Sequence, residues 1–88
     1  MTVAEYERLN KEEKEIILKG NGKLRVYQYM KDYKGITTRE AFVDLGETRL
    51  SGRIYDLVKK DKLNIAHEDI LVKNRYGKNC FVRKYWIA

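Results

Sequence analysis

Residues 36–60, ITTREAFVDLGETRLSGRIYDLVKK, contain two apolar-periodic segments separated by a glycine. Thr37 and Glu40 have the spacing of a capping box, so a helix of about two turns is expected to follow them and to end at Gly46. A second helix is expected from Thr48, its N-cap candidate, to about Lys60. Its buried stripe would be Leu50, Ile54, Leu57 and Val58. This stretch therefore predicts a helix, a glycine turn and a helix.

The residues on either side of this stretch extend the unit at both ends. Helical spacing of apolar residues predicts a helix over 23–33, capped by Gly35. Those apolar residues are Val26, Tyr27, Met30 and Tyr33. Downstream, β-favouring residues predict strands at 63–65, 70–73 and 80–87, and the turn at 74–79 makes a hairpin of the last two. We expect a mainly α fold with a β-hairpin, a winged helix-turn-helix, over residues 23–88.

Residues 1–22 are predicted to form a helical arm outside that domain. Thr2 with Glu5, and Asn10 with Glu13, have capping-box spacing, which predicts two short helices or one kinked helix. The arm carries 4 basic and 5 acidic residues, whereas residues 23–88 carry 15 basic and 8 acidic residues. We expect the arm to pack on its own domain or on a partner.

Composition narrows the classes of function. The 88 residues carry a net charge of +6, with one cysteine and no proline. So short a chain has little left over to wall a deep substrate pocket, and we expect no enzyme. One cysteine makes no internal disulfide, and the first residues lack the features of a signal peptide, so a cytoplasmic location is expected. Apolar runs are too short for a membrane span, and the basic charge favours nucleic acid.

The second helix of the predicted pair carries the main DNA-binding candidates, because in helix-turn-helix proteins this helix enters the major groove. Arg49 and Arg53 lie one helical turn apart and are the leading base-contact candidates, since a guanidinium fork matches guanine or two phosphate oxygens. Gly52 costs a helix about 1 kcal/mol relative to alanine, so it suggests a close approach by DNA or by another helix. The full candidate set is Thr48, Arg49, Gly52, Arg53, Asp56 and Lys60.

The hairpin and the start of the first helix of the pair supply candidates for backbone contacts. The hairpin candidates are Lys73, Arg75, Tyr76 and Lys78. For Lys73 an equal alternative is that charged residues on a strand edge discourage unwanted pairing. Thr38 and Arg39 open a helix, where free backbone N–H groups favour a phosphate.

Other reactive or aromatic residues predict structural roles. Cys80 has no base beside it and is expected to be a small buried residue. Phe81, Tyr85 and Trp86 are expected to cover the helices. His67 has no partners at metal-ligand spacing, so neither a metal nor a cofactor is expected.

Residues 36–57, together with Asn74-Arg75-Tyr76-Gly77-Lys78, resemble a family of small helix-turn-helix proteins frequent in bacteriophages and mobile elements. The resemblance covers about the last two thirds of the chain. It implies a winged helix-turn-helix fold with a recognition helix from about Thr48 and a basic wing around Arg75 to Lys78. Members serve as regulators, excisionase-like architectural factors and replication accessories, and similar folds inhibit host or defence enzymes. The arm lies outside the resemblance.

Two classes of function follow from these features. The first is a non-enzymatic regulator from a phage or mobile element that binds double-stranded DNA in the cytoplasm of a bacterial host cell. The alternative is a protein-interaction module, such as an inhibitor of a host nucleic-acid enzyme. An RNA-binding module is disfavoured because the aromatic residues do not form a stacking platform. A homodimer through the arm is a further possibility, using Tyr6, Leu9, Ile16 and Ile17.

Overall fold

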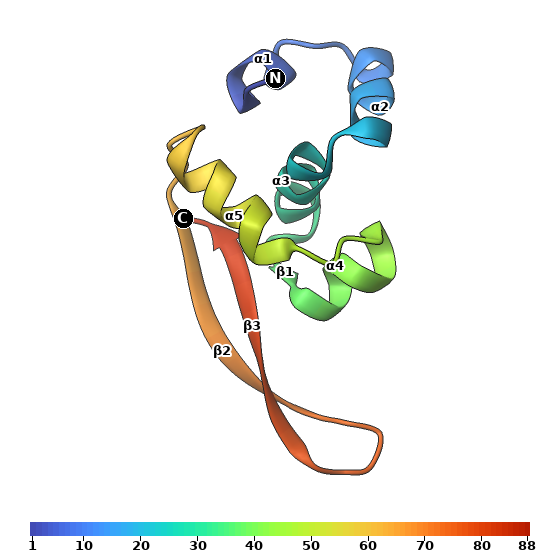
Figure 1. Cartoon of the computed structure of the whole chain (residues 1–88), viewed down its shortest axis with the longest axis vertical. Coiled ribbons are helices and arrows are strands. Elements are labelled where there is room, and N and C mark those ends of the chain that lie inside the picture. Colours follow the sequence, from blue (N-terminus) through green and yellow to red (C-terminus); the bar gives the residue numbers. More distant parts are fainter.

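The computed structural model describes all residues 1–88 and has a mixed α+β architecture (Figure 1). Five helices precede a hairpin that forms most of a three-stranded antiparallel sheet. The elements in chain order are α1 Val3–Glu7, α2 Lys11–Gly20, α3 Gly22–Tyr33, β1 Ile36–Thr37, α4 Thr38–Leu45, α5 Leu50–Lys59, β2 Ile65–Lys73 and β3 Asn79–Ile87.

The helix starts follow local side-chain chemistry. Complete capping boxes begin α1, α2 and α4 at Thr2, Asn10 and Thr37, as the spacing predicts. Gly46 ends α4 in the left-handed conformation, which glycine adopts at little cost. At the end of α3 the residue in this conformation is Lys34, not Gly35, so the predicted glycine cap is displaced by one position.

The sheet has the strand order β1-β3-β2. The two residues of β1, which the sequence pattern did not predict, pair with Tyr85 and Lys84 of β3. The two strands predicted at 63–65 and 70–73 are one continuous strand, β2, which pairs with β3 from Ile65 to Lys73. Charged residues interrupt the apolar pattern of β2, but the backbone pairing of this strand with β3 continues past them.

The core is built from all the helices except α2, together with β1. Eleven buried apolar residues form it, namely Val3, Tyr6, Leu24, Val26, Tyr27, Met30, Ile36, Ala41, Leu50, Ile54 and Leu57. Val3 and Tyr6 belong to α1, so residues of the predicted arm are part of the same core. At the end of α2, Arg25 Nη1 donates to the carbonyl oxygens of Leu18 and Lys19 at 3.0 Å, which fastens this helix to α3.

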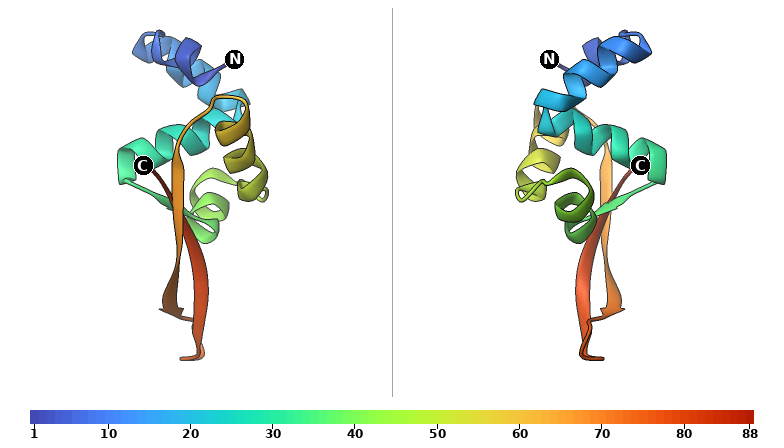
Figure 2. Two further views of the ribbon diagram at one scale, coloured as in Figure 1. Left: turned by 90° about the vertical axis from the view of Figure 1, so that its left-hand side faces the viewer. Right: turned by 90° about the vertical axis from the view of Figure 1, so that its right-hand side faces the viewer.

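The hairpin projects from the helical body. Figures 1 and 2 show β2 and β3 extending well beyond the helices, and the molecule measures 44 × 23 × 19 Å along its principal axes. This projection overturns two expectations. Phe81 is 73% exposed and does not cover the helices. Cys80 is also exposed, because it lies on the part of β3 that no helix reaches.

Some positions on the predicted helix stripes are exposed as well. Tyr33 and Val58 were expected in the core and lie at the surface. Each lies at the C-terminal end of its helix, since α3 ends at Tyr33 and α5 ends at Lys59. None of the helices combines the length and the apolar character that crossing a membrane requires.

Candidate nucleic-acid interface

The outward face of α5 is open to solvent along its length. Its inward stripe is Leu50, Ile54 and Leu57, all buried against the body. The remaining positions include the predicted contact residues, of which Arg49, Gly52 and Lys60 are exposed and Arg53 and Asp56 are partly buried. Helices α1 and α2 lie near the start of α3 (Figure 2), and Arg49, Gly52 and Lys60 stay exposed beside them.

The start of α5 differs from the sequence prediction. The helix begins at Leu50 with Arg49 as its N-cap, and no side chain caps it there. Thr48 is exposed and is not the cap. Instead, Glu47 Oε1 accepts the backbone N–H of Arg49 at 3.1 Å. A carboxylate of the turn therefore holds the residue that precedes the helix, and α5 starts without the predicted hydroxyl cap.

The same carboxylate holds one of the two leading arginines. Glu47 is buried, and its Oε2 lies 3.2 Å from Arg53 Nε. The pair rests against Gly22 at the start of α3, where a Cβ atom would stand 2.6 Å from Glu47 Oε2 and 2.8 Å from Arg53 Nε. The Arg53 side chain is 38% exposed, so it is anchored internally and only part of it faces outward. Arg49 has no such ion pair and is exposed.

The charges around Glu47 keep it ionised. Burial by itself raises the pKa of Glu47, but the N–H of Arg49, the guanidinium of Arg53 and the charge of Arg25 lower it below its ordinary value. The Glu47 carboxylate is buried and already accepts two hydrogen bonds, so it is not free to accept another from a cytosine amino group. Glu47 therefore organises the turn and does not face a partner.

Gly52 lies on the outward face of α5 with nothing packed against it. A Cβ atom built at this position would meet no atom within 4 Å. The glycine opens a shallow hollow of about 340 Å³ on the face of the helix, lined by Arg49, Gly52, Arg53, Tyr55 and Asp56. Tyr55 is 62% exposed and forms one wall of this hollow, although it is not among the contact residues predicted from the sequence. Its position three residues after Gly52 is the signal that would have placed it there.

Two other predicted residues of α5 contact each other at its C-terminal end. Lys60 Nζ lies 3.9 Å from Asp56 Oδ1, an i,i+4 pair on the exposed helix surface. Such a pair contributes only a few tenths of a kcal/mol, about 0.3–0.5. Both groups remain accessible to a partner.

The hairpin turn holds the second predicted group, and it lies far from the first. Arg75, Tyr76 and Lys78 are exposed at the turn, and Lys73 is exposed at the end of β2. Asn74 Oδ1 accepts the backbone N–H groups of Tyr76 and Lys78 and shapes the turn. Figure 1 shows this turn at the end of the molecule remote from α5. The structure does not join the α5 face and the hairpin turn into one continuous site.

The remaining two candidates lie at the start of α4. Thr38 and Arg39 are both exposed in its first turn, where backbone N–H groups are free of intrahelical partners. Nowhere do three His, Cys, Asp or Glu side chains gather in a group that could hold a metal ion.

No protein-family model, curated protein or solved structure matches the chain. The geometry of the molecule is therefore the basis for assigning its function.

Proposed function

We propose that the protein is a non-enzymatic, double-stranded DNA-binding protein of the winged helix-turn-helix class, with α5 in the major groove. The order α3, α4, α5 followed by the β2–β3 hairpin supports this class, because the second helix of the α4–α5 pair leaves its outer face free. Residues 23–88 also carry the excess of basic side chains that a polyanion attracts.

The observation that carries the proposal is the open space at Gly52. A glycine in the middle of a helix costs about 1 kcal/mol relative to alanine, and here no packing within the chain requires it. A bare helix surface lets another surface approach closely. The hollow at Gly52 is lined by Arg49 and Arg53, whose guanidinium groups suit guanine edges and phosphates, and by Asp56, whose carboxylate suits a cytosine amino group.

The two arginines take different parts in this proposal. Arg49 is exposed at the leading end of α5 and is free to reach a phosphate or a guanine. Arg53 is held at Nε by Glu47, which fixes its direction and leaves the far end of the guanidinium for a partner. We assign Arg49 the larger share of binding, in place of the equal roles that the sequence predicts.

Fluorescence anisotropy with labelled duplex DNA tests the proposal. The wild-type protein is expected to bind at low salt, and a site that engages four or five phosphates gives a slope of log K against log salt of about −4. Gly52→Gln should keep or raise the stability of the protein, since the position is empty and glutamine favours a helix. The same change should weaken duplex binding about tenfold or more, because the side chain fills the approach.

A control is Ile16→Gln, which introduces the same side chain without a change of charge. Ile16 is 67% exposed on α2, and no residue of α2 lines the hollow at Gly52. This variant should bind duplex DNA like the wild type. Equal binding by all three proteins would contradict a role for the α5 face, and no binding at low salt would contradict DNA binding altogether.

A second candidate function has one observation in its favour. Leu71 and Phe81 are 57% and 73% exposed on the hairpin, and apolar side chains of this size suit a protein surface better than a sugar-phosphate backbone. If duplex binding is absent at low salt, the alternative of a protein-interaction module takes its place.

A further inference from the structure

The outer edge of β2 has no partner in the chain. Since the strand order is β1-β3-β2, β2 is an edge strand over all nine of its residues. Figure 1 shows no element beyond β2 on its outer side. An edge strand presents a row of unpaired backbone N–H and C=O groups, which is a template for pairing with another strand.

The projecting part of the hairpin carries apolar side chains on both faces, and on one face they lie between the charged residues Asp69, Lys73 and Arg83. Leu71 lies directly opposite Phe81 on one face, where both are exposed. On the other face Ile70 lies opposite Val82, and Val72 lies opposite Cys80. A two-stranded ribbon is marginally stable in water, whereas additional strands with an apolar face give independent stability.

In β2, residues of opposite charge lie at equal distances on either side of Leu71. Reading outward from this residue, Ile70 and Val72 flank it, and Asp69 and Lys73 follow on either side. In an antiparallel pair of identical strands centred on Leu71, Asp69 of each copy stands opposite Lys73 of the other. Opposite charges directly across an antiparallel pair are favourable, and like charges are unfavourable.

We propose that two copies of the chain pair through the β2 edge, antiparallel and centred on Leu71, to form a continuous sheet β1-β3-β2-β2-β3-β1 with two-fold symmetry. At the centre, Leu71 of one copy stands opposite Leu71 of the other. Each Ile70 stands opposite Val72, and each Asp69 stands opposite Lys73, of the other copy. Moving the centre by one residue, to Ile70 or to Val72, would place Leu71 opposite Asp69 or Lys73. The charges therefore select one register, and they do not simply discourage pairing.

The shape of the molecule permits this arrangement. Leu71 is six residues from the start of β2 at Ile65, a distance of about 20 Å along a strand. Because the copies run in opposite directions, their helical bodies lie at opposite ends of the shared sheet. One apolar face would gather Leu71 and Phe81 from both copies.

A second copy accounts for this surface better than the other occupants do. The charged sugar-phosphate backbone suits Leu71 and Phe81 less well than the apolar side chains of a second copy do. In the N-terminal helices, Val3 and Tyr6 belong to the core of the molecule, and Leu9 and Ile17 pack against that core. Of the residues considered for a dimer contact through the arm, only Ile16 is strongly exposed. The inference is independent of the proposed DNA binding, because the α5 face takes no part in it.

Charge reversal provides the test, read by sedimentation or light scattering over a range of protein concentrations. Lys73→Asp would place Asp69 opposite aspartate. The double variant D69K/R83D would place lysine opposite Lys73, while it keeps an ion pair equivalent to that of Asp69 and Arg83, now 3.1 Å. Each is expected to raise the dissociation constant of the dimer about tenfold or more, since each dimer contains two such pairs.

Mixing the two variants should restore the dimer. In the mixed pair, both charge contacts are again between opposite signs, so native mass spectrometry should show the hybrid in excess of either homodimer. Lys78→Asp makes the same change of charge at the turn, outside the paired segment, and should dimerise like the wild type. Circular dichroism should show every variant folded, because residues 69, 73, 78 and 83 are exposed.

Three results would overturn the proposal. The wild type could stay monomeric at several hundred micromolar. The two charge-reversed proteins could dimerise as well as the wild type, which would place the interface elsewhere, for example on α2. The mixture could form no hybrid.

Discussion

At the scale of single residues, Glu47 decides how α5 begins and where Arg53 points. Its two oxygens accept the N–H of Arg49 and the Nε–H of Arg53, so one buried carboxylate satisfies a helix start and a guanidinium together. Hydrogen bonds to a charged group are the stronger kind. The position of Gly22 makes room for this pair, since a side chain there would collide with it.

The pH dependence of stability should therefore report on Glu47. Its pKa is lowered in the folded protein from an ordinary value of 4.5, so its contribution is present above pH 4.5 and is lost as the pH falls through the folded value. Glu47→Gln should cost about 2 kcal/mol in the free energy of unfolding at pH 7. Urea denaturation from pH 7 to pH 3 should show the difference between the two proteins shrinking below pH 4.5. A constant difference across this range would contradict the assignment.

At the scale of elements, the helix starts separate local from tertiary causes. The capping box of α4 lies within four consecutive residues, with Thr37 Oγ1 accepting the N–H of Glu40 at 3.1 Å and Glu40 Oε1 accepting that of Thr37 at 2.9 Å. This local arrangement could be predicted from spacing alone. The start of α5 could not, because Glu47 owes its position to burial beside Arg25 and Arg53.

Two threonine substitutions should show this difference. Thr37→Ala removes a cap and should lower the free energy of unfolding by about 1 kcal/mol. Thr48→Ala changes an exposed side chain that caps nothing, and its effect should stay within about 0.5 kcal/mol. Thermal or urea denaturation of the two variants side by side measures both values. A larger loss at Thr48 than at Thr37 would restore the cap that the sequence favours.

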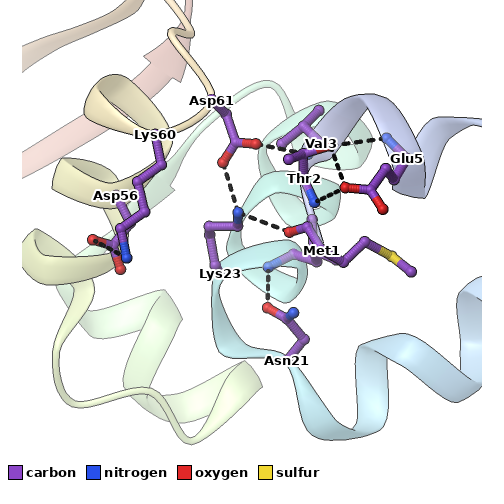
Figure 3. A network of polar contacts seen from close by, with 10 residues as sticks. Met1, Thr2, Val3, Glu5, Asn21, Lys23, Asp56, Lys60 and Asp61 are labelled. Atoms are coloured by element: carbon purple, nitrogen blue, oxygen red, sulfur yellow. Dashed lines mark hydrogen bonds and ion pairs between the residues drawn. The ribbon is translucent and has the colours of Figure 1, made fainter.

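At the scale of the whole molecule, a polar network joins the N-terminal segment to the body (Figure 3). Asp61, just beyond α5, has a side chain only 2% exposed. Its Oδ1 accepts the backbone N–H of Val3 at 2.7 Å, and its Oδ2 lies 2.7 Å from Lys23 Nζ. Lys23 Nζ also donates to the carbonyl oxygen of Met1 at 3.0 Å. Three parts of the chain therefore meet at one buried carboxylate.

Loss of this carboxylate should loosen the N-terminal segment and the body together. Asp61→Ala leaves the ammonium of Lys23 unpaired and nearly buried, and should cost about 3 kcal/mol. Glu7→Ala removes the exposed pair with Lys31, 2.9 Å apart, and should cost less than about 1 kcal/mol. Urea denaturation gives both values. Hydrogen exchange at α1 should rise in the first variant only, and equal losses would contradict the central place of Asp61.

Spacings within the amino-acid sequence were enough to predict the features that neighbouring residues control. The three capping boxes, the glycine stop at Gly46, the hairpin turn and the inward stripe of α5 all follow from spacings of a few residues. The predicted contact residues Arg49 and Gly52 are exposed for the same reason, since they lie off that stripe.

Features that join distant parts of the chain depend on how the helices and strands pack, and so does the exposure of their residues. Glu47 anchors Arg53 because α3 brings Gly22 beside them, and β1 exists because β3 offers it a partner. Phe81 is exposed because the hairpin outruns the helices, a length that no periodicity encodes. Contacts between residues far apart in the chain depend on where whole helices and strands lie in space, and this cannot be predicted from local sequence patterns.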